Sequence, residues 1–343
     1  MLVKVTIIDN KIMKIKETIG IDISKLVFDV RIHSNQKFKI FENSNKGFKG
    51  LVEWVYKNSI YKPCEIMFIF EHTGLYSHLL SVYLTENKIQ FVLVSGLEIK
   101  RSLGMVRGKN DKKDATKIAL YGYRLREELK PYQMPSIELV NIKNLLTLRD
   151  RLVKQRSGYK ASLKEQTRVL VKNDNATLFN THQKMIHYLT KQINTIEKEI
   201  DQIIKSNQLL KNMYTLVTSV KGIGKQTALF LIVYSNGFTK FKNSRKFASY
   251  CGIAPFSNTS GTSIRGKTKV SHLANKKIKS LLDLCAKVAI QHNYEMKIYY
   301  NKRIESGKNK MSTINIIRNK LLSRVFATVQ RNTPYVDILK YVT

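Results

Sequence analysis

Residues 19–32 read "IGIDISKLVFDVRI" and residues 37–44 read "KFKIFENS", and these two stretches decide the fold of the N-terminal part of the chain. Both contain short runs rich in Ile, Val and Phe, and turn-forming residues separate the runs. Such runs are typical of β-strands that are joined by tight turns. The pattern therefore predicts a meander of three antiparallel strands.

The segments that follow alternate between helical and strand patterns. Apolar residues at helical spacing predict helices over about 45–58 and 75–86. Residues 65–74, "EIMFIFEHTG", are a near-continuous apolar run that ends in a glycine turn, as in a strand buried on both faces. A further strand is expected at 89–94, and helical segments extend to about 128. This order of elements is that of a ribonuclease-H-like α/β domain.

Two prolines, Pro131 and Pro135, mark a domain boundary. From about 136 to 211 the only glycine is Gly158, there is no proline, and apolar residues recur every three or four positions, which predicts a long helical hairpin. Its apolar face fits a dimerising coiled coil and a plain packing helix equally well.

The rest of the chain is expected to be mostly helical, with loops rich in Gly, Ser and Lys. We therefore divide the chain into an α/β domain (1–130), a helical or coiled-coil linker (131–211) and a mostly α C-terminal domain (212–343).

The chain is strongly basic, with 60 Lys and Arg against 25 Asp and Glu, a net charge of +35. An AT-rich genome inflates lysine, but it would also supply glutamate, and acids remain few. The excess indicates a polyanionic partner, most simply nucleic acid. The basic clusters expected to contact its backbone are Lys100, Arg101, Arg107, Lys109, Lys112, Lys113, Lys276, Lys277 and Lys279.

Nothing in the sequence indicates a membrane protein, because no run approaches the about 18 apolar residues of a membrane span and no signal-peptide pattern is present. The three cysteines are widely spaced without a CxxC pair, which argues against a zinc site or a disulfide framework. We expect buried thiols and a cytoplasmic protein.

Four carboxylates of the first domain form a candidate metal site. Asp22 lies in the first strand, Glu71 ends the strand "FIFE", and Asp111 and Asp114 lie three residues apart on one face of a predicted helix. Acids from separate elements that converge on one point are what a pair of Mg²⁺ ions requires. Alternatively, Asp111 and Asp114 are only acids that the helix dipole favours at a helix N-terminus.

Two glycine-containing segments of the second half fit phosphate. In "TSGTSIRGK", residues 259–267, hydroxyls, backbone N–H groups, Arg265 and Lys267 are placed to surround a phosphate, although such a segment is usually only a loop. Residues 217–232, "VTSVKGIGKQTALFLI", fit a helix-hairpin-helix, whose turn binds phosphate without reading sequence, or an ordinary turn between helices. The residues of that turn are Lys221, Gly222, Gly224 and Lys225.

The segments "GIDISK", "FEHTGLY" and "KNDKKDATKIA", together with "ASYCGIAPFSNTSGTSIRGKTKVSHLANKKIKSLL", resemble the motif blocks of the DEDD transposases of the IS110 insertion-sequence family. The likeness covers nearly the whole chain except the first 18 residues, which extend beyond the usual start. It implies a RuvC-like N-terminal domain with Asp22, Glu71, Asp111 and Asp114 as metal ligands. It also implies that Ser260 is the recombination nucleophile, and Ser257 and Ser263 are neighbours from which it must be distinguished.

By the same resemblance, the expected partners are double-stranded DNA of donor and target, a structured bridge RNA and further copies of the chain in a dimer or tetramer. Nothing in the sequence indicates the RNA directly. Two other interpretations stay open. One is a RuvC-like junction nuclease, in which metal-activated water is the nucleophile, and the other is a nucleic-acid-binding protein with a decayed site, which the intact set of four acids disfavours.

Overall fold

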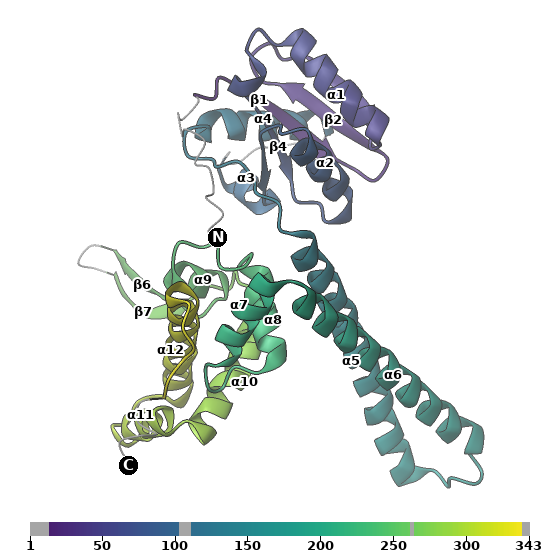
Figure 1. Ribbon diagram of the computed structural model, residues 1–343, viewed down its shortest axis with the longest axis vertical. Coiled ribbons are helices and arrows are strands. Elements are labelled where there is room, and N and C mark those ends of the chain that lie inside the picture. Colours follow the sequence, from purple (N-terminus) through teal and green to yellow (C-terminus); the bar gives the residue numbers. More distant parts are fainter. Residues whose placement is uncertain (1–13, 103–110, 261–263, 338–343) are drawn as a thin grey trace. The chain divides into compact units, whose positions relative to one another are not determined.

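The computed structural model describes residues 14–102, 111–260 and 264–337 (Figure 1). The chain forms two compact units, an N-terminal unit (1–134) and a C-terminal unit (135–343), and each has its own hydrophobic core. In the described residues, no helix is long and apolar enough to cross a membrane. For a few residues within the helices and strands the description covers the backbone and not the side chain, namely Asp111, Lys112, Ser260, Ile264, Arg265 and Lys267.

The N-terminal unit is built on a five-stranded mixed sheet of order β3-β2-β1-β4-β5. The strands β1 (Glu17–Ile23), β2 (Val27–Ile32) and β3 (Phe38–Glu42) are antiparallel neighbours, which confirms the predicted meander. The strands β4 (Ile66–Glu71) and β5 (Phe91–Val94) continue the sheet in parallel with β1. This is the ribonuclease-H-like arrangement that the order of elements predicts.

Helices cover both faces of this sheet, because β4 is apolar on both. Phe68 and Phe70 pack with residues of α1 (Asn45–Asn58) and α2 (Leu75–Glu86). Met67 and Ile69 point to the other face and pack with residues of α3 (Gly96–Ser102) and α4 (Asp111–Leu125). Side chains of a strand alternate between faces, so one continuous apolar run supplies two cores. A 3₁₀ turn, Pro63–Glu65, precedes β4.

A long helical hairpin opens the C-terminal unit. The helix α5 (Ile137–Val169) begins at Ser136, whose hydroxyl accepts a hydrogen bond from the N–H of Leu139. A short turn leads to α6 (Ala176–Ser206), and the apolar stripe of α6 is buried in this unit at Leu189, Ile193, Ile196, Ile200 and Ile204. This burial within the chain is what the interpretation of the segment as a packing helix expects.

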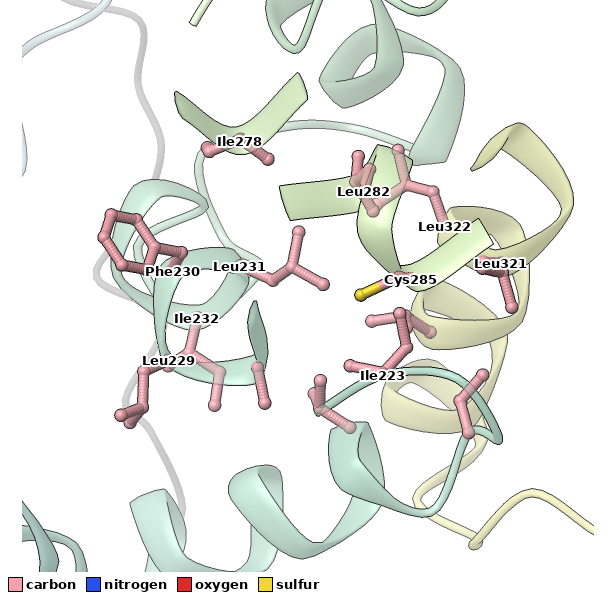
Figure 2. Close-up of a cluster of buried hydrophobic side chains, with 14 of the residues drawn as sticks. Ile223, Leu229, Phe230, Leu231, Ile232, Ile278, Leu282, Cys285, Leu321 and Leu322 are labelled. Carbon is pink, nitrogen blue, oxygen red and sulfur yellow. The ribbon is translucent and has the colours of Figure 1, made fainter. Parts of the chain in front are cut away.

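The helix α8 (Lys225–Tyr234) lies in the core of the C-terminal unit and is buried from Thr227 to Val233. Figure 2 shows part of the core, in which Leu231 and Cys285 lie among residues of several helices. A helix that is apolar on every side has no solvent face and serves as the centre of a core. The same core contains residues of α7 (Gln208–Thr218), α9 (Ser244–Tyr250), α10 (Lys276–His292), α11 (Tyr294–Glu305) and α12 (Lys310–Arg331). The strands β6 (Pro255–Ser260) and β7 (Ile264–Val270) form a separate two-stranded sheet.

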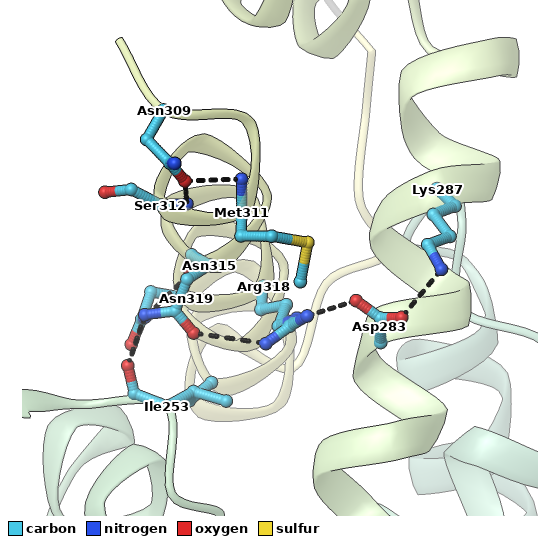
Figure 3. Close-up of polar contacts among 9 residues, drawn as sticks. All are labelled: Ile253, Asp283, Lys287, Asn309, Met311, Ser312, Asn315, Arg318 and Asn319. Carbon is cyan, nitrogen blue, oxygen red and sulfur yellow. Dashed lines mark hydrogen bonds and ion pairs between the residues drawn. The ribbon is translucent and has the colours of Figure 1, made fainter. Parts of the chain in front are cut away.

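A buried ion pair joins α10 to α12. The guanidinium of Arg318, only 7% exposed, binds the carboxylate of Asp283, and Lys287 lies 2.9 Å from the same carboxylate (Figure 3). Burial acts to raise the pKa of Asp283, but the hydrogen bonds and positive charges of Lys287 and Arg318 hold it below its ordinary value. The pair ties together two helices that are separated by α11.

Candidate active site

The strand ends bring Asp22 and Glu71 to one edge of the sheet. Strands β1 and β4 are parallel, and Ile21 is in register with Phe70, so the next residue of each strand lies at the same carboxyl end. Asp22 and Glu71 are both half-buried there. In open α/β sheets this edge is where functional groups commonly lie.

Both carboxylates lie on the face of the sheet that α4 covers. Ile21 and Phe70 belong to the core under α1 and α2, so the side chains next to them in each strand point to the opposite face. The antiparallel register of β1 with β2 places Asp29 directly opposite Asp22, and Asp29 is 8% exposed. Residues directly opposite in an antiparallel pair share a face, so Asp29 joins this group of acids.

The helix α4 approaches β1 closely because β1 has a glycine at position 20. A Cβ on Gly20 would lie 2.2 Å from the carbonyl oxygen of Ala115 and 2.3 Å from the nitrogen of Ala119, distances that no side chain can adopt. The hydroxyl of Thr18 donates a hydrogen bond of 2.9 Å to the carbonyl oxygen of Ala119. Small residues therefore fix the distance between the helix and the strand that carry the acids.

This packing brings the first turn of α4 near Glu71. Burial raises the pKa of the Glu71 carboxyl, and the negative charge of Asp114 raises it further, so the two carboxylates interact. Asp114 also accepts a hydrogen bond of 2.6 Å from the ammonium of Lys117 on the next turn. A Cβ on Gly96, the first residue of α3, would lie 2.7 Å from Oε2 of Glu71, so glycine leaves room for this carboxylate.

Asp111 is the first residue of α4, and its side chain lies outside the part of the structure that is described. Among the described side chains, no group of three or more His, Cys, Asp or Glu is close enough to hold a metal ion as it stands. The donors on this face of the sheet, from Asp22, Glu71 and Asp114, are carboxylate oxygens, the ligands that Mg²⁺ prefers. The residue types and their shared edge therefore fit a hard divalent cation.

Ser260 is the last residue of β6, in the C-terminal unit. The strands β6 and β7 form an antiparallel hairpin in which Ser260 is in register with Ile264. The sequence predicts only a loop here, so the two strands correct that expectation. Residues 261–263, which include Ser263, lie outside the described residues, as do the side chains of Ser260, Arg265 and Lys267.

Hydrogen bonds to α12 fix the segment that leads into this hairpin. The carbonyl oxygen of Ile253 accepts hydrogen bonds from the side-chain amides of Asn315 (2.8 Å) and Asn319 (3.0 Å) on α12 (Figure 3). Gly252 has a φ of +67°, and a Cβ there would lie 2.3 Å from Cβ of Ala274. The chain therefore leaves α9 along a fixed path before it enters β6.

The predicted phosphate-binding turn lies between α7 and α8, which form a helix, a turn and a second helix. Gly222 has a φ of +95°, which favours glycine, and Gly224 is the N-cap of α8. The ammonium of Lys221 lies 2.9 Å from the carboxylate of Asp337, so one of the two predicted lysines is already paired, while Lys225 is exposed.

The remaining basic candidates divide into exposed and paired side chains. Lys277 forms an ion pair of 2.7 Å with Asp150, and Lys279 is half-buried. Arg107 and Lys109 lie outside the described residues, as does the side chain of Lys112. The exposed members are Lys100, Arg101, Lys113 and Lys276.

Comparison with known proteins assigns the family. A model of the IS110 DEDD transposase domain, described as a transposase, matches residues 19–171. A second model, described as the transposase IS116/IS110/IS902 family, matches residues 214–301. The first match contains all four acids predicted as ligands, and the second contains Ser260 together with the turn before α8.

Comparison of the chain with related proteins points to the same family. The chain is 30% identical over 332 residues to pilin gene-inverting proteins of Moraxella bovis and Moraxella lacunata, covering 93% of this chain and 98% of theirs. It is also 27% identical over 144 residues to an uncharacterized 43.6 kDa protein of insertion element IS110 from Streptomyces coelicolor, 42% of this chain and 34% of that protein. The chain therefore belongs to the IS110 family of transposases, enzymes that recombine DNA.

Proposed function

We propose that this enzyme cuts and rejoins the double-stranded DNA of an insertion element, with Ser260 as nucleophile and a Mg²⁺-binding acid cluster as its second catalytic component. The observation that carries the proposal is the register of β1 and β4, because it puts Asp22 and Glu71 at one edge of the sheet. The close packing of α4 on β1 adds Asp114, which interacts with Glu71.

In this proposal Asp22, Glu71, Asp111 and Asp114 hold two Mg²⁺ ions. When bound, Mg²⁺ stabilises the negative charge that gathers on the oxygens of a reacting phosphate. The carboxylates hold the ions in position beside the reacting phosphate. Exposed basic residues such as Lys113 bind the DNA backbone on either side of that phosphate.

The proposed role of Ser260 is to exchange one phosphodiester bond for another. Its hydroxyl oxygen forms a bond to a backbone phosphorus, and the bond from that phosphorus to one deoxyribose oxygen breaks. The released deoxyribose oxygen gains a proton as the serine hydroxyl loses one. Rejoining reverses this step with the hydroxyl of another DNA end, so the bond energy is conserved and no cofactor is oxidised or consumed.

The proposed partners are donor and target DNA and a structured bridge RNA that selects the sites by base pairing, with the chain acting as a dimer or tetramer. The support for the RNA and for the oligomer is the family resemblance, together with a charge of +35 that suits both nucleic acids. The phosphate-binding turn around Gly222 and Gly224 and the residues Arg265 and Lys267 are proposed backbone contacts.

The names of the Moraxella relatives state that they invert a pilin gene. Inversion of a segment and movement of an element both require that DNA is cut at the two ends of the segment and that the cut ends are joined to new partners. We therefore propose for this chain a chemistry in which cut ends stay attached to the protein until they are rejoined.

A covalent intermediate tests the proposal. Wild-type protein and Ser263→Ala, incubated with labelled DNA and Mg²⁺, should give a retarded protein–DNA band on a denaturing gel, and Ser260→Ala should give none. Binding of DNA by Ser260→Ala should persist, because only one hydroxyl is removed.

The same gel distinguishes the proposed serine recombinase from the alternative enzyme, a junction nuclease. A RuvC-like junction nuclease would use metal-activated water, so Ser260→Ala would cleave at the wild-type rate and release ends free of protein. That result would overturn the serine mechanism and leave the acid cluster as the whole active site.

A further inference from the structure

The segment after α8 presents Lys240 on a tightly bonded turn. The backbone N–H of Lys240 donates to the carbonyl oxygen of Ser235 (3.0 Å), and the N–H of Phe238 donates to the hydroxyl of Ser235 (2.9 Å). Asn236 and Phe238 both have positive φ, 51° and 64°, a backbone conformation that costs free energy at residues other than glycine. Such strain is kept where the surrounding contacts fix the chain, so the position of Lys240 is set.

Aromatic rings hold the side chain of Lys240. Its ammonium lies 5.7 Å from the ring centre of Phe241 and 5.6 Å from that of Tyr250. Phe241 and Tyr250 pack on each other and on Phe247, with ring centres 4.9 to 5.9 Å apart. The cation therefore rests on a rigid platform that attracts positive charge.

A second lysine lies beside this platform. Lys143 of α5 places its ammonium 5.9 Å from the ring centre of Tyr234. The protein atoms around the Lys240 ammonium lower its pKa, and the like charge of Lys143 lowers it further. The positive charge of Lys143 therefore acts on Lys240, and both lysines lie beside aromatic rings of this unit.

Among the described residues, no carboxylate pairs with Lys143 or Lys240 to neutralise their positive charges. In the described residues neither Lys143 nor Lys240 forms an ion pair, and both side chains are exposed to solvent. The nearby Lys277 differs, because it pairs with Asp150 at 2.7 Å while it also lies over the ring of Phe230. The protein thus pairs one lysine of this region and leaves two adjacent ones available to an external anion.

Neutral hydrogen-bonding groups border the two lysines. The hydroxyl of Tyr250 accepts a hydrogen bond from the amide of Asn275 (3.2 Å), which leaves its own proton available. Asn275 caps α10, so the N-terminal end of that helix faces the same region. Both features favour negative charge there.

We infer that Lys143 and Lys240, supported by the ring cluster of Phe241, Phe247 and Tyr250, bind the phosphodiester backbone of a nucleic acid. A phosphodiester supplies the missing negative charge and accepts hydrogen bonds from both ammonium groups and from the Tyr250 hydroxyl. The site reads no base, so its role is to fix the position of the strand. The inference rests on the proposed function for its ligand.

The test measures the binding of nucleic acid under conditions in which no DNA is cleaved. Fluorescence anisotropy of a labelled mixed-sequence DNA duplex is measured in EDTA at several salt concentrations, with a hairpin RNA in a parallel series. Lys143→Gln and Lys240→Gln should each lower the slope of log affinity against log salt by about 0.9 on duplex DNA. Lys240→Arg should keep the wild-type slope, and Lys308→Gln, which removes an exposed charge from the same unit, is the matched control.

The outcomes separate this inference from the proposed function. Wild-type slopes for both glutamine variants on DNA and on RNA, or an equal decrease for Lys308→Gln, would overturn the inference alone. A change on only one of the two probes would identify which nucleic acid supplies the phosphate. Failure of the wild-type protein to bind either probe would instead remove the proposed function, whatever the variants do.

Discussion

Acids are scarce in this chain, and the structure collects several of them on one face of one sheet. Asp22, Asp29 and Glu71 come from three adjacent strands, and Asp114 comes from the helix above them. The motif resemblance predicts three of these, but Asp29 stands in "VFDVRI", where the sequence indicates only a strand. Its place opposite Asp22 depends on the strand register, which becomes visible only in the folded sheet.

The acid cluster makes a prediction about metal affinity. Asp111→Asn and Asp114→Asn keep the shape of the side chain but remove the charge, so Mg²⁺ binding and strand cleavage should be abolished while DNA binding persists. Calorimetric titration with Mg²⁺ measures the affinity independently of activity. Asp174→Asn, an exposed acid in the turn of the helical hairpin, is the control, and unchanged Mg²⁺ affinity in the double Asp111/Asp114 variant would refute the ligand assignment.

The three thiols should differ in reactivity. Burial raises the pKa of Cys251 to about 12 and also raises the pKa of Cys285, whereas Cys64 is only half-buried. Because the thiolate is the reactive form, a disulfide reagent at about pH 8 should label Cys64 rapidly and the other two only after unfolding. Cys64→Ser should abolish the fast reaction, and a fast phase that survives in this variant would contradict the burial of the others.

At the scale of elements, the sequence predicts the sheet and the hairpin of long helices because their apolar residues follow clear periods. The hairpin β6–β7 escapes prediction because "PFSNTS" and "IRGKTKV" have no apolar alternation, and the strand pairing rests on backbone hydrogen bonds. The two interpretations of α6 could not be separated from spacing alone, since only the folded chain shows that α6 buries its stripe within its own unit.

The ion pair between α10 and α12 predicts a pH-dependent stability. The pKa of Asp283 is lower in the folded protein than in the unfolded chain. The carboxylate therefore makes its full contribution to the free energy of unfolding at pH values above its pKa in the unfolded chain. That contribution is lost as the pH falls through its pKa in the folded protein. Asp283→Asn should lower the free energy of unfolding by about 2 kcal/mol near neutral pH, because hydrogen bonds between charged groups are removed.

Denaturant unfolding at several pH values measures this effect. The difference between wild type and Asp283→Asn should shrink below about pH 4, where the wild-type carboxylate also becomes neutral. Asp174→Asn, which removes an exposed carboxylate, should differ little from wild type at any pH. A difference for Asp283→Asn that stays constant down to about pH 2 would show that the stability lost in the variant does not come from the charge of the carboxylate.

At the scale of the whole molecule, the residues proposed for catalysis come from both units. The acids belong to the N-terminal unit and Ser260 to the C-terminal unit, and each unit has a core that packs independently of the other. The family comparison spans both, because one matched segment covers the acids and the other covers Ser260. Recombination is thus expected to need the full chain, although the proposed metal ligands all belong to the first unit.

The charge of the whole molecule makes a prediction about salt. With 60 basic against 25 acidic residues, binding should be dominated by phosphate contacts, so log affinity for duplex DNA should fall steeply and linearly with log salt. Reversing the charges of Lys112 and Lys113 should flatten the line by about 0.9 for each phosphate that is no longer neutralised. Anisotropy titrations at several salt concentrations measure the slope, and an affinity that salt hardly changes would exclude phosphate-dominated binding.

The close approach of α4 to Gly20 determines what alanine scanning of this enzyme would report. Gly20 contributes no atom to any reaction, yet a methyl group there would meet the backbone of Ala115 and Ala119 and push the helix outward. Metal–ligand distances tolerate errors of only about 0.2 Å, so the proposed ligands Asp114 and Asp111 would be carried out of range. Gly20→Ala would therefore have the phenotype of a catalytic substitution, although what it changes is the gap between a strand and a helix.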